Sequence, residues 1–280
     1  MILHEDKKSI IKNHATSQVH ENIRILVLIP TLKEIPSRLV LKLYRQSLKP
    51  SQIIIIASSK KLCNIITNEV MLPDVRCIEV KPNMREHVGI RVGKAINEAF
   101  QQLNINDYDY IIKADADIDI SYKFLETCIG LDADLIGTGP FMVIRKEPFL
   151  KLCNGRYPET PADDTYLILR FQSAGLKVAR WPQGIKITRK GGTFGNWRYY
   201  FLRGMDYFKI GIDPIHVIRG AFHLIKNRHT LLPIFDLVGY FLAMIKMENR
   251  YKFSNDVFHF LVMNFLRNII GKIVSVVDRI

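Results

Sequence analysis

The sequence predicts an α/β fold in which helices cover both faces of a mostly parallel sheet. Two continuous apolar runs, 23–29 and 52–57, are rich in isoleucine and typical of strands buried on both faces. A segment with helical spacing of leucines, 39–48, lies between them, so the three predict a strand–helix–strand unit with a right-handed crossover. A third apolar run, 110–112, leads directly into alternating aspartates. These acids therefore lie at a strand end, where open α/β sheets bind ligands.

The other elements continue this alternation through the first two thirds of the chain. We expect strands over 23–29, 52–57, 75–80, 110–112, 134–139, 141–144 and 177–180. We expect helices over 39–48, 63–70, 89–100, 124–129, 146–152 and from Asp163 to Gly175. A chain of 280 residues with 48% hydrophobic and 24% charged residues can bury a substantial core.

Asp115, Asp117 and Asp119 follow the apolar run 110–112 at alternate positions. If the backbone stays extended there, Asp115 and Asp117 point to the same side of the chain. Two carboxylates beside a crevice suit a hard divalent cation that also holds the phosphates of a nucleotide. The alternative is an acidic turn after a strand, because aspartate favours such turns.

Two further segments place small or charged residues at the start of a helix. Gly89 and Gly93 let the helix 89–100 approach the sheet or a ligand closely, and Arg91 offers a cation near its start. Plain helix–sheet packing would also account for these glycines. Asp163 and Asp164 open a later helix, where the helix dipole favours acids even without a catalytic role.

The order of these motifs over residues 23–185 resembles the family 2 glycosyltransferases. The pieces that carry the resemblance are Pro30-Thr31 with Glu34, Gln46-Ser47 with Pro50, Gly89 to Ala99, Asp115-Ala116-Asp117, Gly139 with Phe141 to Arg145, and Asp163-Asp164-Thr165 with Leu169-Arg170. The resemblance implies a GT-A type nucleotide-sugar-binding fold. It also implies an inverting sugar transferase that uses a nucleoside diphosphate sugar and Mg²⁺ or Mn²⁺.

The resemblance assigns roles to individual residues of this chain. Asp115 and Asp117 look like the family's acid-x-acid pair, with Asp117 as the more direct metal ligand and Asp115 also near the nucleotide. Asp164 resembles the catalytic base, which takes the proton from the acceptor hydroxyl. The remaining contacts, to the nucleoside and to its base or phosphate, fall on Pro30, Thr31, Glu34 and Arg91.

One position departs from the family's pattern. After the second strand the family usually places an aspartate that hydrogen-bonds the base, whereas this chain has Ala57-Ser58-Ser59. The hydroxyl of Ser58 can still contact a base or a ribose, but the usual carboxylate acceptor is missing. We therefore leave the nucleotide open between uridine, guanosine and thymidine diphosphates.

The C-terminal third is basic and predicts a helical extension. The chain has a formal net charge of +13, and residues 186–280 carry more than half of this excess. We expect a polar leader at 1–22, a transferase domain at 23–225 and an amphipathic helical extension at 226–280, with a flexible basic loop at 184–195. The helix at 256–280 either packs on the catalytic domain or lies on an anionic membrane surface. Nucleic acid is the least favoured partner, since no nucleic-acid motif is present.

The cysteines and the lack of long apolar segments predict the compartment of the protein. Four widely spaced cysteines predict reduced thiols. The sequence shows no signal peptide and no run of about 20 apolar residues, so we expect a cytoplasmic protein. If the C-terminal helix lies on a membrane, the protein is peripheral on its cytoplasmic face. Its partners would be the donor sugar nucleotide and a glycan or lipid-linked acceptor. The alternatives are a nucleotidyltransferase, or an inactive glycan- or lipid-binding module that kept the fold.

Overall fold

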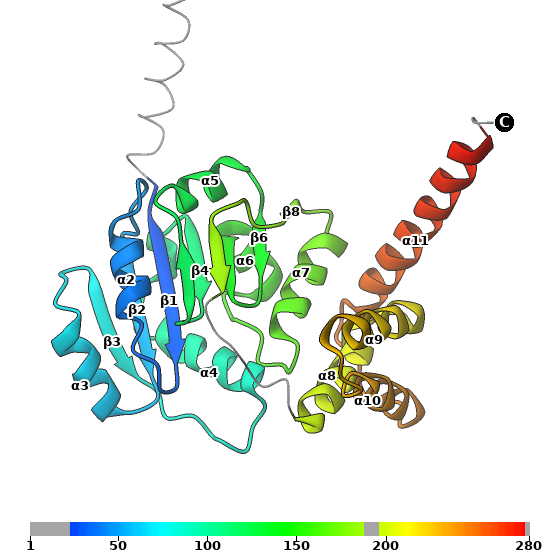
Figure 1. Ribbon diagram of the computed structural model, residues 1–280, viewed down its shortest axis with the longest axis horizontal. Helices are drawn as coiled ribbons and strands as arrows, with labels where there is room; N and C mark the ends of the chain where they lie inside the picture. The colour runs from blue at the N-terminus through cyan, green and yellow to red at the C-terminus, as the bar shows by residue number, and fades with distance from the viewer. Residues whose placement is uncertain (1–22, 188–195, 278–280) are drawn as a thin grey trace, which may run out of the picture.

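In the computed structural model, residues 23–187 and 196–277 are described, and they form an α/β part followed by a helical part (Figure 1). Seven strands of the described residues form one sheet in the order β3-β2-β1-β4-β7-β6-β8. Their bounds are β1 (Ile25–Thr31), β2 (Gln52–Ala57), β3 (Val75–Glu79), β4 (Tyr110–Ala114), β6 (Leu135–Thr138), β7 (Phe141–Arg145) and β8 (Val178–Ala179). The predicted mostly parallel α/β sheet is confirmed, with β7 antiparallel to both of its neighbours.

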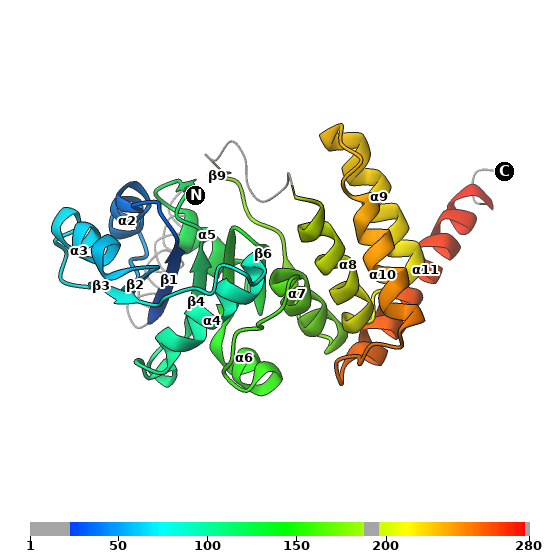
Figure 2. The same ribbon diagram turned by 90° about the horizontal axis from the view of Figure 1, so that it is seen from below.

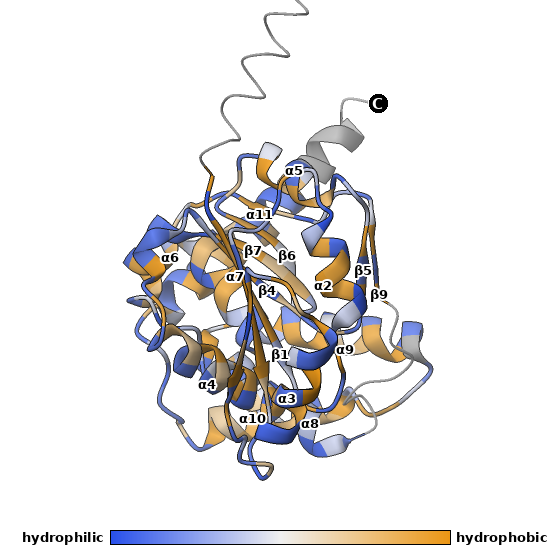
Figure 3. Cartoon of the chain, turned by 90° about the vertical axis from the view of Figure 1, so that its left-hand side faces the viewer, coloured by the Kyte–Doolittle hydropathy of each residue, from blue (hydrophilic) through white to orange (hydrophobic). Residues whose placement is uncertain are grey.

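Helices cover both faces of this sheet, as predicted. On one face α2 (Ser37–Tyr44), α3 (Lys60–Glu69) and α5 (Phe124–Gly130) share a core with the strands. On the other face α4 (Val88–Phe100), α6 (Lys146–Cys153) and α7 (Asp163–Ser173) do the same. Figure 3 shows the consequence in hydropathy, because the central strands such as β1 and β4 are mostly hydrophobic while the helices also carry hydrophilic residues. Burial on both faces explains why the strand sequences are continuous rather than alternating.

The main departures from the predicted elements lie around the acidic stretch. β4 extends two residues beyond the predicted end and includes Lys113, which is buried. The backbone then turns at residues 116 and 117 instead of staying extended, and β5 (Ile118–Ile120) pairs with β9 (Ile185–Ile187) in a separate two-stranded sheet. The alternation of the aspartates therefore does not mean that they share one side of a strand.

The helical part consists of α8 (Trp197–Ile210), α9 (Pro214–Arg228), α10 (Ile234–Ile245) and α11 (Ser254–Val277). In Figure 2, α8, α9 and α10 lie beside one another next to α7, and α11 extends away from them. Leu169 of α7 shares a buried cluster with residues of all four helices, such as Phe208 of α8 and Val257 of α11. The predicted division between residues 225 and 226 lies inside α9.

The expected amphipathic helix is present as α11, and its two halves differ. Val257 is buried and Leu261 packs on the helical core, whereas Leu266, Ile269 and Ile270 are exposed. The first half of α11 therefore packs on the helical core, as one of the two alternatives expected. No helix among the described residues is both long enough and apolar enough to cross a membrane. The predicted leader at 1–22, and most of the predicted loop at 184–195, lie outside the described residues.

One cysteine prediction was wrong. Cys63 of α3 and Cys77 of β3 form a disulfide, although they are 14 residues apart and were expected as reduced thiols. Spacing along the chain did not reveal the pair, because α3 returns antiparallel to the strands and brings its first turns beside β3. Cys128 and Cys153 are free thiols.

Candidate active site

The ends of three neighbouring parallel strands bring the predicted nucleotide and metal residues to one edge of the sheet. Thr31 at the end of β1 pairs in register with Ala57 at the end of β2, and Lys113 of β4 pairs with Leu28 of β1. Ser58 and Asp115 follow β2 and β4 directly. The carboxyl ends of parallel strands are the usual ligand edge of such a sheet, so the predicted grouping is reproduced by the topology.

The loop after β1 is held to the loop after β2 by hydrogen bonds. The Thr31 hydroxyl donates to the Glu34 carbonyl at 2.6 Å, which closes a tight turn. The Ser58 hydroxyl donates to the Leu32 carbonyl at 2.6 Å, and the Ser58 N–H donates to the Thr31 carbonyl at 3.2 Å. Ser58 therefore shapes the turn. Since its proton is used there, it can offer a ligand only the acceptor capacity of its oxygen.

A buried lysine, which sequence reasoning did not assign, occupies the middle of the acidic cluster. Lys113 Nζ lies 2.5 Å from Asp115 Oδ1 and also donates to the Gly139 carbonyl. Burial alone would lower the pKa of Lys113, but the negative charges of Asp115, Asp163 and Asp164 hold this pKa above its ordinary value. Lys113 therefore stays charged and joins the strand-end acid to the acids at the start of α7.

Asp163 and Asp164 lie in the first turn of α7, but neither caps it. The N-cap residue is Ala162, which makes no side-chain cap hydrogen bond. Asp164 Oδ2 accepts from the Gly139 N–H at 3.2 Å, and Asp164 Oδ1 accepts from the Thr165 N–H at 2.8 Å. Because Lys113 contacts the carbonyl of the same Gly139, Asp164 and Asp115 are linked through three hydrogen bonds. Both acids nevertheless lie in the first turn, where the helix dipole favours them, so the alternative without a catalytic role stays open.

The environment of Asp163 differs from that of Asp164. Burial raises the pKa of Asp163 to about 7, helped by the charge of Asp164 and opposed by Lys113 and by a hydrogen bond from Tyr157. The Tyr157 hydroxyl donates to Asp163 Oδ2 at 3.0 Å. A carboxyl that titrates near neutrality beside a second carboxyl is a recurring feature of sites that move protons.

Helix α4 holds the segment before α7 in place through its small residues. A Cβ added at Gly89 would lie 2.4 Å from the Thr160 carbonyl oxygen, and one at Gly93 would lie 2.3 Å from that of Pro158. One turn further on, Asn97 receives a hydrogen bond from the Tyr157 N–H at 2.8 Å and donates to the Tyr157 carbonyl at 2.9 Å. The plain packing alternative for the glycines therefore holds, and this packing positions Asp163 and Asp164.

The loop before α4 meets the helical part at a group of polar aromatic and basic side chains. His87 caps α4, with Nδ1 accepting from the Gly89 N–H at 3.1 Å, and its ring stacks on Tyr199 of α8 at 4.8 Å. Burial lowers the pKa of His87 to about 4, helped by the charges of Arg203 and Arg91. The imidazole is therefore neutral, and because Nδ1 accepts, Nε2 carries the proton.

One nitrogen atom in this region is buried without a hydrogen-bond partner among the described residues. This atom is Nε of Arg91, whereas the His87 ring also makes a hydrogen bond with the Tyr199 backbone. Arg91 also contacts Met84, with Nη1 3.0 Å from the sulfur. Buried polar groups are almost always paired in folded proteins, and in this region both Nε of Arg91 and Oε2 of Glu86 are buried without a partner among the described residues. Phosphate oxygens are the kind of acceptor that a helix start and a guanidinium favour.

The residues fit a divalent cation if the ligand supplies part of its coordination. No group of three or more His, Cys, Asp or Glu side chains within the described ranges could hold a metal ion. Asp115, with its side chain 36% exposed, and the partly buried Asp117 still offer the hard oxygen donors that Mg²⁺ and Mn²⁺ prefer. Mg²⁺ is commonly held by one or two carboxylates plus phosphates and waters, which matches this small donor set.

Several residues of this site were missed by the sequence reasoning, and their signals differ in strength. Lys113 had a signal, because a lysine inside an apolar strand directly before an aspartate requires a charged partner. Asp163 was noted only as the neighbour of Asp164. Tyr199 and Arg203 had only a weak signal, the enrichment of their segment in aromatic and basic residues. Nothing in the order of the chain indicates that α8 packs against His87.

Comparisons with known proteins inform the fold and not the activity. No model of a protein family matches the chain, and no curated protein matches it. A solved structure described as "Crystal Structure of a Mycobacterial Protein" is similar in fold, with a TM-score of 0.50 at 11% sequence identity. The similarity covers 69% of this chain and 76% of the mycobacterial one.

Proposed function

We propose that this chain is a metal-dependent inverting glycosyltransferase of the family 2 type, with a GT-A nucleotide-sugar-binding fold. It would move a sugar from a nucleoside diphosphate sugar to an acceptor hydroxyl or a lipid phosphate. The observation that supports this most is the connected acidic group at the strand ends. In it, Asp115, Lys113, Gly139 and Asp164 form one hydrogen-bonded chain between the β4 end and the α7 start.

Asp164 is the proposed general base. The N–H groups of Gly139 and Thr165 each bond one of its oxygens, so they fix the orientation of the carboxylate. The acceptor oxygen attacks the anomeric carbon and gives its proton to Asp164, while the bond from that carbon to the nucleoside diphosphate breaks. Inversion at the anomeric carbon follows from a single displacement. An acceptor phosphate is already ionised and would not need this base.

The donor would lie along the strand ends. The turn from Thr31 to Glu34 and the adjacent Ser58 are proposed to hold the nucleoside, with Pro30 at the base of the turn. Arg91 is the proposed donor to phosphate oxygens. Bound at Asp115 and Asp117, Mg²⁺ or Mn²⁺ would supply positive charge that stabilises the departing diphosphate.

Calorimetric titration of a nucleoside diphosphate tests the donor site. Binding of the uridine, guanosine or thymidine diphosphate that the wild type prefers should tighten with Mn²⁺, and Asp115→Asn or Asp117→Asn should weaken it, because an amide is a poorer ligand for a hard cation. Asp119→Asn is the matched control. Asp119 belongs to the same acidic stretch but pairs with Arg38 and Lys42. Equal affinity with metal and with chelator would refute the metal-dependent part of the proposal.

Single-turnover transfer assays test the proposed base. Asp164→Asn should slow transfer to a hydroxyl acceptor by at least about 100-fold, the lower range for loss of a general base, while diphosphate affinity stays unchanged. Full transfer by this variant to every hydroxyl acceptor would show that Asp164 is not the base. Retained transfer to lipid phosphates alone would instead identify the acceptor as a phosphate.

The proposed location is the cytoplasmic face of a membrane, with the basic helical part toward the lipid. Reducing conditions there would open the Cys63–Cys77 disulfide. Thiol titration of protein purified under non-reducing lysis distinguishes the cases. Four reactive thiols in denaturant support a cytoplasmic protein, and two support an oxidising compartment.

A further inference from the structure

The helical part contains a pocket of about 250 Å³ that neither the donor nor the proposed base uses. It lies among α7, α8, α9, α10 and α11. Six apolar side chains from α7, α9, α11 and the turn before α9 line it: Leu169, Ile212, Val217, Ala221, Leu224 and Leu261. On α9 the lining residues Val217, Gly220, Ala221 and Leu224 follow three- and four-residue steps, so one face of this helix forms the pocket wall.

One residue of the pocket wall contacts the proposed base. Thr165 lines the pocket, and its N–H donates to Asp164 Oδ1 at 2.8 Å. Tyr207 also lines the pocket. Burial raises the pKa of its phenol and the charge of Arg203 opposes this, while the negative charges of Asp236 and Asp164 raise the pKa further. Thr165 therefore joins the apolar wall to Asp164, so a ligand that extends past Thr165 would meet this carboxylate.

Two charged residues of the pocket wall already satisfy one another. Arg203 bonds Asp236 through Nε at 3.0 Å and through Nη2 at 2.6 Å, and both side chains are almost completely buried. Such a closed pair offers little to a polar ligand, since its hydrogen bonds are used internally. The pocket thus selects for apolar surface, with polar recognition restricted to the region of Thr165 and Asp164.

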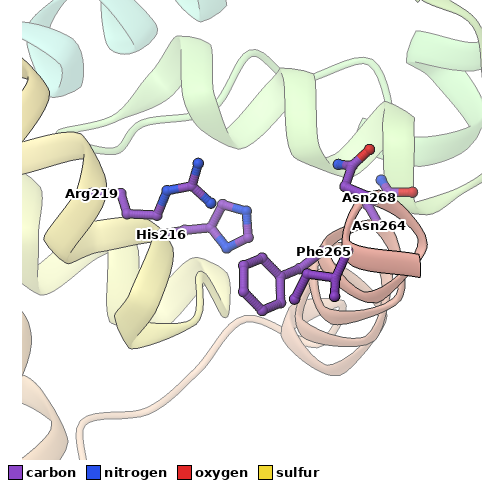
Figure 4. Close-up of a pocket in the computed structure, with 6 residues that line it drawn as sticks. His216, Arg219, Asn264, Phe265 and Asn268 are labelled. Carbon is purple, nitrogen blue, oxygen red and sulfur yellow. The ribbon is translucent and has the colours of Figure 1, made fainter. Parts of the chain in front are cut away.

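One side of the pocket opens toward the protein surface between α9 and α11. His216 lines the pocket and also lines a second one of about 210 Å³, whose wall includes Arg219 of α9 and Asn264, Phe265 and Asn268 of α11. Figure 4 shows Arg219 and His216 on one helix facing Phe265 and the two asparagines on the other. Beyond it, Leu266, Ile269 and Ile270 expose apolar surface on α11. A long apolar chain could leave the molecule along this route.

We propose that this pocket binds the hydrocarbon chain of a lipid acceptor and directs the head group of that lipid to Asp164. This inference rests on the proposed transferase function and narrows its acceptor from a glycan or lipid-linked group to an amphiphile. A volume of about 250 Å³ is below that of usual drug-sized sites, about 300–1,000 Å³, so it fits part of a chain rather than a whole ligand.

Gly220 provides the variant that tests the pocket. It lies on the pocket wall, and a Cβ added there meets no atom within 4 Å, so a side chain at this position enters open space. Gly220→Trp should block the pocket without disturbing the core. Gly220→Ala keeps the pocket open, and Gly130→Trp is the matched control, because Gly130 is a helical glycine of α5 that also faces open space.

The measurement is the affinity of butyl, hexyl, octyl and decyl phosphate, each below its micelle-forming concentration, by calorimetry. In the wild type, Gly220→Ala and Gly130→Trp, each added methylene should tighten binding about fourfold from the hexyl compound on, the value for transfer of a methylene out of water. In Gly220→Trp, decyl phosphate should bind at least about 30-fold more weakly than in the wild type, and butyl phosphate almost equally well.

The outcomes separate this inference from the proposed function. Two results would overturn the pocket assignment even if the donor experiments succeed. In one, the affinity of Gly220→Trp still rises with the length of the alkyl phosphate. In the other, the affinity of the wild type does not depend on that length. Chain-length dependence without metal-dependent diphosphate binding would support a lipid pocket and refute the transferase. If Gly220→Trp fails to fold, the smaller Gly220→Val takes its place, and this variant must reduce the increase of affinity with alkyl chain length.

Discussion

Gly93→Ala is expected to destabilise the chain and to displace the proposed base, although the same substitution usually strengthens a helix. An alanine in a helix interior is favoured over glycine by about 1 kcal/mol. In α4, however, the new Cβ would lie 2.3 Å from the Pro158 carbonyl oxygen and 3.0 Å from the Glu159 Cα. Both neighbours are backbone atoms, so the segment before α7 has to move by about 1 Å to restore ordinary contact.

The cost can be worked out from the contacts of that segment. Overpacking at a close-packed site costs about 1–3 kcal/mol. The shift also weakens the two hydrogen bonds between Asn97 and Tyr157, each worth about 1 kcal/mol. After the gain of about 1 kcal/mol in helix propensity, the net loss is about 2 kcal/mol, which lowers Tm by about 4–8 °C for a chain of this size. A displacement of about 1 Å at Asp164 should reduce kcat by about 100-fold.

Thermal unfolding followed by circular dichroism measures the stability, and transfer assays measure kcat. Gly220→Ala is the control, because its Cβ meets open space and the usual gain applies, so that its Tm should rise by about 2–4 °C. If Gly93→Ala raises Tm as much as Gly220→Ala does, the close contact between α4 and residues 157–163 is not present in solution.

Three other perturbations have expected outcomes. The pKa of Asp163 is about 7 in the folded chain, which is above its value in the unfolded chain. Its contribution to the free energy of unfolding is therefore present below about pH 4 and is lost as pH rises to about 7. Denaturant titrations at several pH values should show this decrease in the wild type and a flatter pH dependence in Asp163→Asn. Arg203→Met should cost about 3–5 kcal/mol in the same assay by leaving Asp236 buried and unpaired, and adding Asp236→Leu should restore most of it. The full chain should float with anionic liposomes at low salt. A chain that ends at residue 262 should not float, because this shorter chain lacks the exposed Leu266, Ile269 and Ile270. Equal flotation of the two chains would place any membrane contact elsewhere.

The strands and their flanking helices were predictable because burial on both faces leaves a clear record in the sequence. The isoleucines of β2 were predicted with the observed bounds, since a short continuous run of β-branched apolar residues is typical of a strand with both faces buried. Two short elements were missed for the opposite reason. β5 and β9 have three residues each and are recognisable only from their pairing, which joins positions 118–120 to 185–187.

Other misses reflect interactions between distant parts of the chain. The end of β4 was placed too early, because a lysine looks like a boundary unless its buried partners are known. α9 has an N-terminal signal that was not used, in which Asp213 caps the helix and Pro214 occupies its first turn. The acids of the candidate site could be placed from the strand ends, whereas the contribution of α8 could not, because His87 and Tyr199 are more than 100 residues apart in the sequence.

The packing of α8 has a consequence for how such chains can be recombined. Tyr199 stacks on His87, and Ala162, just before the proposed base, donates its N–H to Asp206 of the same helix at 3.0 Å. α8 is in turn fixed to α10, since Gly204 and Gly239 each approach the backbone of the opposite helix too closely to accept a Cβ. A chimera that exchanges the C-terminal helices would therefore also replace the side chains that pack on His87 and Ala162, next to the proposed donor site. New acceptor preferences could be grafted onto this sheet only together with compensating changes at His87 and in the 157–163 segment.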